Sequence, residues 1–272
     1  MGDMFNALAS AGLLILAIVL FVALTIACEI GFRAGRWHGQ TIGKKAEEEN
    51  ASTGTVAAGM LGLLAFILGL TINFAQTRFE ARRELVAVEA NTIGTAWLRA
   101  RMIGGPDGDA LAGEIHDYAK TRLAFTEART PKPLPGLIKA TGDEQDRIWA
   151  LTTRIARTAP SPISATLVNA VNDMIDASLS QRFAFDGRVP GDMVAMLCVG
   201  SLLAIGAMGF QLGLTGVRQQ TLTSLLLLMW TGGIVMTVDL ERPRLGSVRV
   251  EATPLRWTIQ GFESAPPNPS RP

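Results

Sequence analysis

One uncharged stretch of sequence constrains this chain more than any other. Residues 51–77 contain no ionisable side chain, and at the helical rise this length exceeds the roughly 20 residues that span a bilayer. Charged residues begin at Arg78, but no proline or glycine pair interrupts the sequence before Gly104. Beyond the charged positions, Val86, Ala90 and Ile93 keep an apolar stripe at helical spacing, which Trp97 extends. The pattern predicts one long helix over residues 51–102 that leaves a membrane and continues in water.

The composition and three further apolar runs are typical of a multi-span membrane protein. The mean hydropathy is +0.27 and only 18% of the residues are charged. Runs long enough to span a bilayer cover residues 4–28, 193–217 and 219–238. We therefore predict an all-α, four-transmembrane-helix membrane protein with a helical soluble insertion between the second and third spans.

The same pattern predicts four regions along the chain. Residues 1–76 would hold membrane helices 1 and 2, joined by a polar connection at 33–50 that we interpret as a solvated loop. Residues 77–189 would form a helical extramembrane domain, and residues 190–238 would form membrane helices 3 and 4 as a tight hairpin. The remaining segment, 239–272, would be a charged tail that is disordered beyond Gly261, where it is rich in proline and serine.

Within the expected insertion, capping residues and prolines predict where helices begin and end. Asp107 or Asp109 can cap a first helix. The prolines of 130–136 predict a short extended linker, after which a helix resumes over 143–157. Ser161-Pro162 is typical of an N-cap followed by proline in the first turn. The apolar positions expected inside are Leu111, Ile115, Ala119, Leu123, Ile148, Leu151, Ile155, Ile163, Leu167, Val171 and Met174.

The sequence does not contain the motifs of the common enzyme classes. It has no glycine-rich phosphate loop, no His-Glu-x-x-His and no Cys-x-x-Cys. Two histidines, His38 and His116, cannot build a multi-histidine metal site, and Cys28 and Cys198 lie in apolar runs where a thiol acts as a small hydrophobe. We expect neither an enzyme nor a bound metal or cofactor. The net charge of +1 argues against a nucleic-acid partner.

Polar and small residues inside the spans are candidate functional or packing positions. Asn73 and Gln211 lie well inside apolar runs, where a polar side chain either bonds a neighbouring helix or lines a wet path. Gly209 and Gly213 would allow close backbone approach of another helix, a packing role. Basic residues flank the spans on both sides, so charge alone does not decide the orientation in the membrane.

Several segments resemble a known family. The segment Phe66-Ile-Leu-Gly-Leu70, followed after six residues by Thr77-Arg78-Phe79, resembles the second membrane helix of bestrophin channels. The pattern there is Phe-Val-Leu-Gly-Phe, the same gap, and Thr-Arg-Trp. Residues 89–101 and 239–250 look like signatures of the bacterial bestrophin-like family of uncharacterised membrane proteins, and this second resemblance spans nearly the whole chain.

The resemblance implies an ion channel in the bacterial inner membrane. It implies a homo-pentamer in the lipid bilayer, with termini and insertion cytoplasmic, that conducts small inorganic ions through a neck lined by the second helices. Neck positions carried over by the motif fall on Gly62, Phe66 and Leu70, and Phe74 extends the face. An apolar neck gates by dewetting. Since Gly62 is small and Leu70 is not aromatic, a wider neck or a gate elsewhere is expected.

The resemblance also bears on calcium. An acidic run after the fourth span clasps calcium in animal bestrophins, and here it is reduced to Asp239 and Glu241. Calcium gating of that kind is therefore not expected.

Three alternatives stay open. Phe66 and Leu70 either line a pore or face lipid or a packed bundle. A pore exit collar would consist of Arg78, Arg82, Arg83 and Glu89. If its basic members face the pore axis, they raise the local anion concentration. If they pair with carboxylates along the helix or between subunits, their role is structural. We favour pairing for most of them. The alternative function is a non-conducting membrane scaffold or signalling protein whose helical domain binds a partner.

Overall fold

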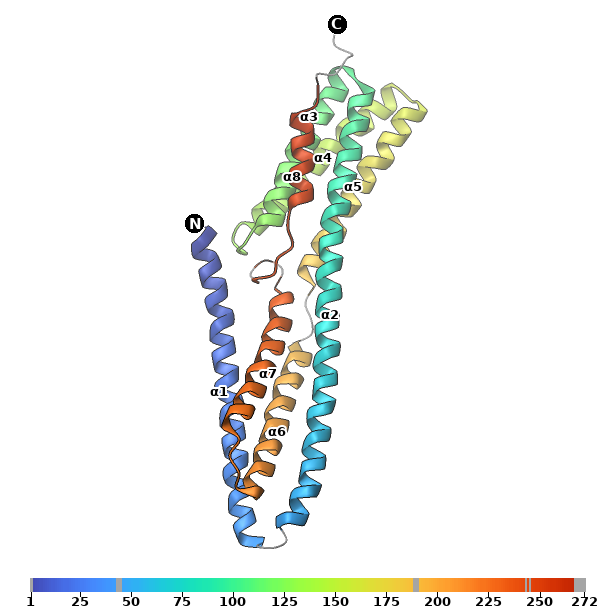
Figure 1. Ribbon diagram of the computed structural model, residues 1–272. Coiled ribbons are helices and arrows are strands. Elements are labelled where there is room, and N and C mark those ends of the chain that lie inside the picture. Colours follow the sequence, from blue (N-terminus) through green and yellow to red (C-terminus); the bar gives the residue numbers. More distant parts are fainter. Residues whose placement is uncertain (1, 43–45, 188–190, 243, 245, 267–272) are drawn as a thin grey trace. The chain divides into compact units, whose positions relative to one another are not determined.

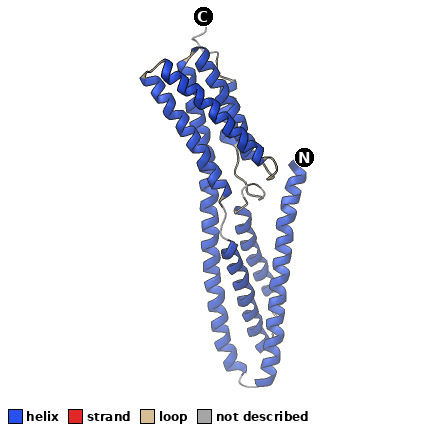
Figure 2. Cartoon of the chain, turned by 180° about the vertical axis from the view of Figure 1, so that it is seen from behind, coloured by secondary structure: helices blue, strands red, loops and turns tan. Residues whose placement is uncertain are grey.

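The computed structural model describes residues 2–42, 46–187, 191–242, 244 and 246–266, and this part of the chain holds helices and no strand (Figure 2). The helices are α1 (Gly2–Ile42), α2 (Ala46–Ile103), α3 (Gly105–Glu127), α4 (Leu134–Thr158), α5 (Pro162–Asp186), α6 (Gly191–Thr215), α7 (Gln220–Leu240) and α8 (Thr253–Glu263). The predicted all-α fold is confirmed.

Four helices of the described chain are long and apolar enough to cross a membrane. They are Gly12–Ile42 in α1, Glu49–Ile103 in α2, Val194–Thr215 in α6 and Gln220–Leu240, which is α7. The four predicted spans are therefore confirmed. The third and fourth agree closely with their predicted limits, because an uncharged run of this length has few alternatives to a membrane helix.

The chain folds into two compact units. The membrane unit consists of residues 1–77, 188–242 and 246–248, and the helical unit consists of residues 78–187, 243–245 and 249–272. Helix α2 contributes its first half to the membrane unit and its second half to the helical unit. Figure 1 shows α1, α6 and α7 along the first half of α2, and α3, α4, α5 and α8 along the second half.

The loop predicted at residues 33–50 is wrong for most of its length. Helix α1 continues through Ile42 and α2 begins at Ala46, so only residues 43–45 separate them, and these lie outside the described residues. Polar side chains of this segment pair within α1 and between α1 and α2: Arg33 donates to Glu29 at 2.8 Å, and His38 Nε2 lies 2.9 Å from Oε1 of Glu49. Because no proline interrupts it, a polar exposed helix is as compatible with this sequence as a loop.

Helices α1 and α6 of the membrane unit approach each other at glycine positions. A β-carbon added to Gly209 would lie 2.2 Å from the carbonyl oxygen of Cys28, and one added to Gly213 would lie 2.2 Å from that of Phe32. Gly35 of α1 leaves room in the same way for the backbone of α6. Backbones this close gain dispersion contacts that larger side chains would prevent.

The core of the helical unit is built from the predicted apolar faces. The buried positions include Val86, Ala90, Ile93, Trp97, Leu111, Ile115, Ala119, Ile148, Ile155, Leu167, Val171 and Met174. Leu123 and Leu151 pack partly against them. Ile163, one residue after the start of α5, is exposed instead.

The predicted start of the first helix in this unit is wrong. Helix α3 begins at Gly105, and neither Asp107 nor Asp109 caps it. Gly104 stands at the N-cap with φ 67°, a left-handed conformation that favours glycine and ends α2 sharply. Pro106 follows in the first turn of α3, where its missing amide hydrogen costs no helical hydrogen bond.

The linker predicted over 130–136 is shorter than expected. Helix α4 already begins at Leu134, with Pro135 in its first turn, because proline fits the start of a helix although it breaks the interior. The N-cap predicted at Ser161 is confirmed. Its hydroxyl accepts a hydrogen bond from the amide of Ser164 at 3.1 Å, and the Ser164 hydroxyl accepts one from the Ser161 amide.

The tail at 239–272 contains a helix that the sequence did not predict. Leu255 and Ile259, one turn apart in α8, are buried in the helical unit. The ring of Phe262 stacks on Trp97 with 4.4 Å between ring centroids, so disorder does not begin just after Gly261 as expected. The rest of the predicted disordered end falls on residues 267–272, which lie outside the described residues.

Candidate functional site

The membrane half of α2 packs against its own chain through a single narrow stripe. The buried positions between residues 55 and 76 are Ala57, Leu64, Leu68, Thr71 and Ala75. At 3.6 residues per turn these positions fall on one side of the helix. The other sides of this uncharged segment are therefore left for lipid or for another copy of the chain.

The four predicted neck positions lie together on these exposed sides. Phe66, Leu70 and Phe74 have exposed fractions of 64%, 44% and 54%, and Gly62 is exposed one turn before Phe66. A β-carbon added to Gly62 would meet no atom within 4 Å. The row winds gradually around α2, since four-residue steps exceed the helical repeat. It offers apolar surface without a group that could replace the hydration shell of an ion.

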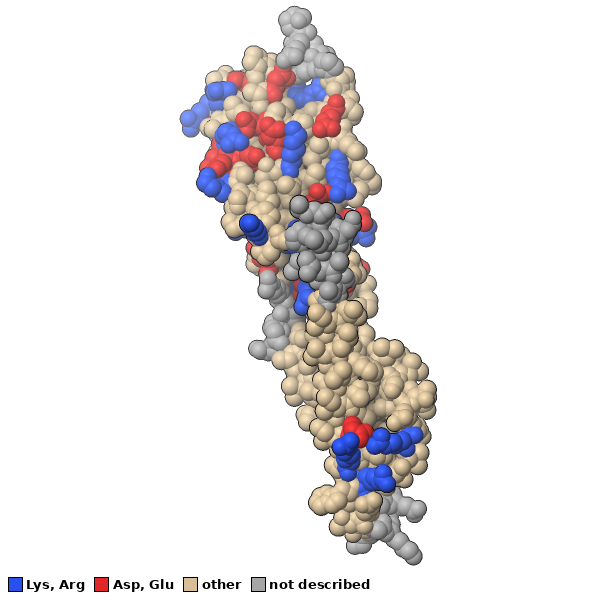
Figure 3. All heavy atoms as spheres, turned by 90° about the vertical axis from the view of Figure 1, so that its left-hand side faces the viewer, with Lys and Arg blue, Asp and Glu red and all other residues tan. Residues whose placement is uncertain are grey.

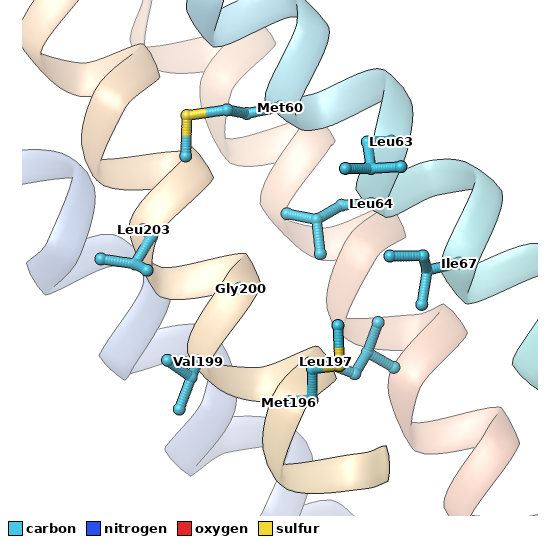
Figure 4. Close-up of a pocket in the computed structure, with 9 residues that line it drawn as sticks. All are labelled: Met60, Leu63, Leu64, Ile67, Met196, Leu197, Val199, Gly200 and Leu203. Carbon is cyan, nitrogen blue, oxygen red and sulfur yellow. The ribbon is translucent and has the colours of Figure 1, made fainter.

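A groove of about 330 Å³ lies between α2 and α6 (Figure 4). Leu63, Leu64 and Ile67 of α2 face Leu197, Gly200 and Leu203 of α6 across it, and Met60, Met196 and Val199 complete the lining. All nine lining residues are apolar, so the groove has no side chain that could bind an ion. Chemically it can accept only an acyl chain or apolar side chains.

The two polar residues predicted inside the membrane are not brought together. Asn73 is exposed on α2, next to Phe74. Gln211 on α6 lies against the opposite end of the same span, because a β-carbon added to Gly54 would lie 2.4 Å from its Nε2. Gln211 therefore contacts α2 across a helix interface, whereas Asn73 belongs to the exposed surface.

Arg82, predicted for an exit collar, is turned into the helical unit. It is 1% exposed, its Nε donates to the carbonyl oxygen of Ala184 at 3.0 Å, and its Nη2 donates to that of Gly187 at 2.9 Å. Both carbonyls belong to the C-terminal end of α5, where the helix leaves acceptors unsatisfied and its dipole is negative. Arg82 thus caps α5, while Arg78 is half-buried and Arg83 is exposed.

Glu89, the fourth collar residue, is fully buried and pairs with a residue that the sequence did not single out. Its Oε1 accepts from Nε of Arg122, on α3, and Arg122 also donates to Oε1 of Gln181. Gln181 donates in turn to the Thr126 hydroxyl at 2.9 Å. The sequence did contain a signal for this pair: Arg122 follows Ala119 by three residues, so it lies on the apolar face of its helix.

Arg244 is a further buried arginine whose structural role the sequence did not predict. Its Nη1 donates to the carbonyl oxygen of Phe125 at 2.7 Å, at the C-terminal end of α3, and its guanidinium lies over the rings of Phe125 and Phe185. Burial lowers its pKa to about 10. The only indication of this role in the sequence was that Arg244 lies in segment 239–250, which resembles a signature of the bestrophin-like family.

Asp239 has a local structural partner. Its carboxylate accepts hydrogen bonds from the backbone amides of Ser247 at 2.6 Å and Val248 at 3.2 Å. The carboxylate therefore closes the turn after α7. Among the described residues, no group of three or more metal-ligating side chains could hold an ion.

Comparisons with known proteins agree with this architecture. The sequence model of the Bestrophin-like domain matches residues 30–255. The crystal structure of a bacterial bestrophin homologue from Klebsiella pneumoniae matches with a TM-score of 0.62 at 16% identity, over 92% of this chain and 96% of that chain. A point variant of that homologue matches with a TM-score of 0.63 at 14% identity, over 93% and 99% of the two chains. At these identities the likeness shows the fold. A comparison with curated protein sequences gave no match.

Proposed function

The chain belongs to the Bestrophin-like domain family, and on that premise we propose that it is an ion channel of the bacterial inner membrane. Copies of the chain, five in the arrangement that we favour, would surround a central pore. The first half of α2 from each copy would line it. Gly62, Phe66, Leu70 and Phe74 would form the hydrophobic neck, through which small inorganic ions pass.

The observation that carries the proposal is the one-sided packing of α2. Apolar side chains that a span leaves exposed can face lipid or the same helix of another copy. Here Phe66 and Leu70 point away from the rest of the chain, and only a narrow stripe contacts it. A ring of such helices supplies a lining of identical apolar side chains at each level.

The neck would control ion conduction by whether water fills it. An ion can pass a constriction only with enough water to keep its hydration, and an apolar ring such as one of Phe66 favours the dry state. Gly62 and Leu70 make the neck wider than aromatic residues at those positions would. Of the predicted collar, Arg78 and Arg83 remain candidates to influence ions at the exit, whereas Arg82 and Glu89 are engaged inside the helical unit.

Electrical recording from the purified chain in planar lipid bilayers tests this function. The wild-type protein is expected to carry ion currents, and Phe66→Ala is expected to raise the current several-fold because it weakens the apolar barrier. Leu14→Ala is the matched control, since Leu14 of α1 has a nearly equal exposed fraction, 62% against 64%. Absence of wild-type current with every ion and potential tried would reject the channel.

One observation favours the alternative of a membrane scaffold with a binding partner. The helical unit exposes large apolar side chains, Phe183 with 79% of its surface and Trp257 with 68%. A bound partner would cover such aromatic side chains. A neighbouring copy in the channel assembly would cover them equally well, so this alternative gains support only if the reconstituted chain is silent.

A further inference from the structure

A second pocket of the membrane unit, of about 260 Å³, lies beside the turn between α6 and α7. Its lining comes from α1, the end of α6, the start of α7 and the turn between α6 and α7. Glu29, Arg218, Gln220, Thr223 and Ser224 give it a polar part, and Phe32 belongs to its apolar part with Cys28 and Leu227. The pocket is separate from the α2 face proposed for conduction, and that function leaves it without a role.

Arg218 is held in place by two contacts. Its Nη2 donates to Oε1 of Glu29 at 3.0 Å, and its guanidinium lies over the ring of Phe32 with 4.5 Å from Cζ to the centroid. The same carboxylate oxygen accepts from Nε of Arg33 at 2.8 Å. Two guanidinium groups therefore share one carboxylate, and the three groups together carry one excess positive charge. The Arg218 side chain keeps 45% of its surface exposed.

The pocket lies where the apolar parts of the spans end. Glu29 is the first ionisable residue after the uncharged segment 4–28, and Arg218 directly follows the apolar run of α6. Figure 3 shows a small group of acidic and basic atoms near one end of the membrane unit, whose visible surface next to this group is uncharged. On the membrane side of Glu29 and Arg218, the pocket is lined by the apolar side chains of Cys28, Leu212 and Leu227. The pocket thus joins a cationic end to an apolar, lipid-compatible surface.

We propose that this pocket binds an anionic phospholipid. Arg218 would hydrogen-bond the phosphate oxygens, since the planar guanidinium matches phosphate geometry, and the hydroxyl groups of Thr223 and Ser224 would complete the contacts. An acyl chain would follow the apolar surface of α1 and α7. Basic pockets between membrane helices have the electrostatics required for lipid headgroups. The apolar continuation of the pocket is what favours a lipid over free phosphate.

The role of Glu29 separates lipid binding from a purely structural ion pair. Its carboxylate fixes Arg218, but it also repels a bound phosphate. If the cluster serves only to hold α1 to the α6–α7 turn, Glu29→Gln and Arg218→Gln both weaken the same contact. If the pocket binds phospholipid, Arg218→Gln lowers the affinity and Glu29→Gln raises it.

Native mass spectrometry of the full chain in neutral detergent, with added phosphatidylglycerol or phosphatidylcholine, tests the proposal. The wild-type chain is expected to retain more phosphatidylglycerol than phosphatidylcholine. Arg218→Gln is expected to lower that retention about tenfold, the loss of a charge-assisted hydrogen bond. Ser224→Phe fills the pocket without changing the charge and should also lower it. Arg36→Gln, which removes the same charge from α1 outside the pocket lining, should have a smaller effect.

Four results would overturn the proposal. They are equal retention of the two lipids, an equal effect of Arg36→Gln and Arg218→Gln, unchanged retention in Ser224→Phe, and lower retention in Glu29→Gln. Displacement of the lipid by inorganic phosphate alone would show a phosphate site rather than a lipid site. Because Ser224→Phe and Glu29→Gln leave Arg218 in place, the test stays decisive even if Arg218→Gln does not fold.

Discussion

At the scale of single residues, two arginines of the helical unit end at helix C-termini. Arg82 donates to carbonyl oxygens at the end of α5, and Arg244 does so at the end of α3. The last carbonyl groups of a helix have no partner within it, and the helix dipole makes that end negative, so a guanidinium satisfies both demands. Arg82 and Arg244 are therefore basic residues near the ends of membrane spans with a structural role inside the helical unit.

Arg82→Lys is predicted to destabilise the helical unit by about 1–3 kcal/mol. A lysine ammonium is a point charge and cannot bridge the carbonyls of Ala184 and Gly187 in the geometry of the guanidinium. Thermal unfolding in detergent, followed by circular dichroism, measures the loss. Arg83→Lys is the control, because Arg83 is the exposed neighbour in the same helix. Equal unfolding temperatures for the two variants would contradict the capping role.

Glu144→Gln is predicted to stabilise the helical unit at about pH 8 and to have no effect near pH 3. Burial raises the pKa of Glu144 in the folded chain, and its Oε2 is buried without a hydrogen-bond partner among the described residues. The folded state therefore favours the protonated form. That contribution is present at low pH and is lost as the pH rises through the folded pKa.

The control for this pH dependence is Asp146→Asn, an exposed carboxylate on the same helix α4. Its unfolding temperature should follow that of the wild-type chain at every pH. If Glu144→Gln instead lowers the unfolding temperature at about pH 8, the charged form of Glu144 is the one that the fold stabilises, and the sign is wrong.

At the scale of elements, helix limits could be predicted from the sequence where a single physical requirement determined them. A long uncharged run must cross the membrane as a helix, so the limits of α6 and α7 could be predicted closely. The extension of α1 to Ile42 could not, because a polar helix and a polar loop have similar composition. Helix α8 depends on a partner far away in sequence: it is ordered by burying Leu255 and stacking Phe262 on Trp97.

In the candidate site, too, some features could be predicted from the local sequence and others depend on how distant helices pack. The motif and the helical repeat were enough to place Phe66 and Leu70 on one exposed side of α2. They were not enough to find the partner of Glu89, since the Arg122 pair closes between residues 33 positions apart. Such a pair follows from how α2 and α3 pack, which local pattern does not encode.

Gly209→Ala is predicted to destabilise the packing of α1 on α6 by about 1–3 kcal/mol. The new methyl group would lie 2.2 Å from the Cys28 carbonyl oxygen, and backbone cannot move aside as a side chain can. The measurement is the unfolding temperature together with the fraction of monodisperse protein after detergent extraction. Gly232→Ala on α7 is the control, because its added β-carbon meets nothing within 4 Å. A similar loss in both variants would contradict the prediction.

At the scale of the whole molecule, the membrane unit has apolar surface that its own helices do not cover and that lipid or other copies of the chain can contact. The membrane unit exposes large apolar side chains on all its spans, as lipid contact requires, but α2 contributes far less to the internal core than its length allows. A helix that is aromatic, glycine-rich and held along one stripe is suited to face the corresponding helices of other copies. The channel proposal depends on that assembly, whereas the fold and the phospholipid pocket do not.

Single-particle electron microscopy of the purified full chain tests the central claim most directly, because the claim concerns how copies meet around α2. We predict a five-fold ring with an axial hole, in which the α2 helices surround the hole and Phe66 faces it. A dimer without a hole, or a ring in which the Phe66 face of α2 is turned outward to lipid, would contradict the proposed pore.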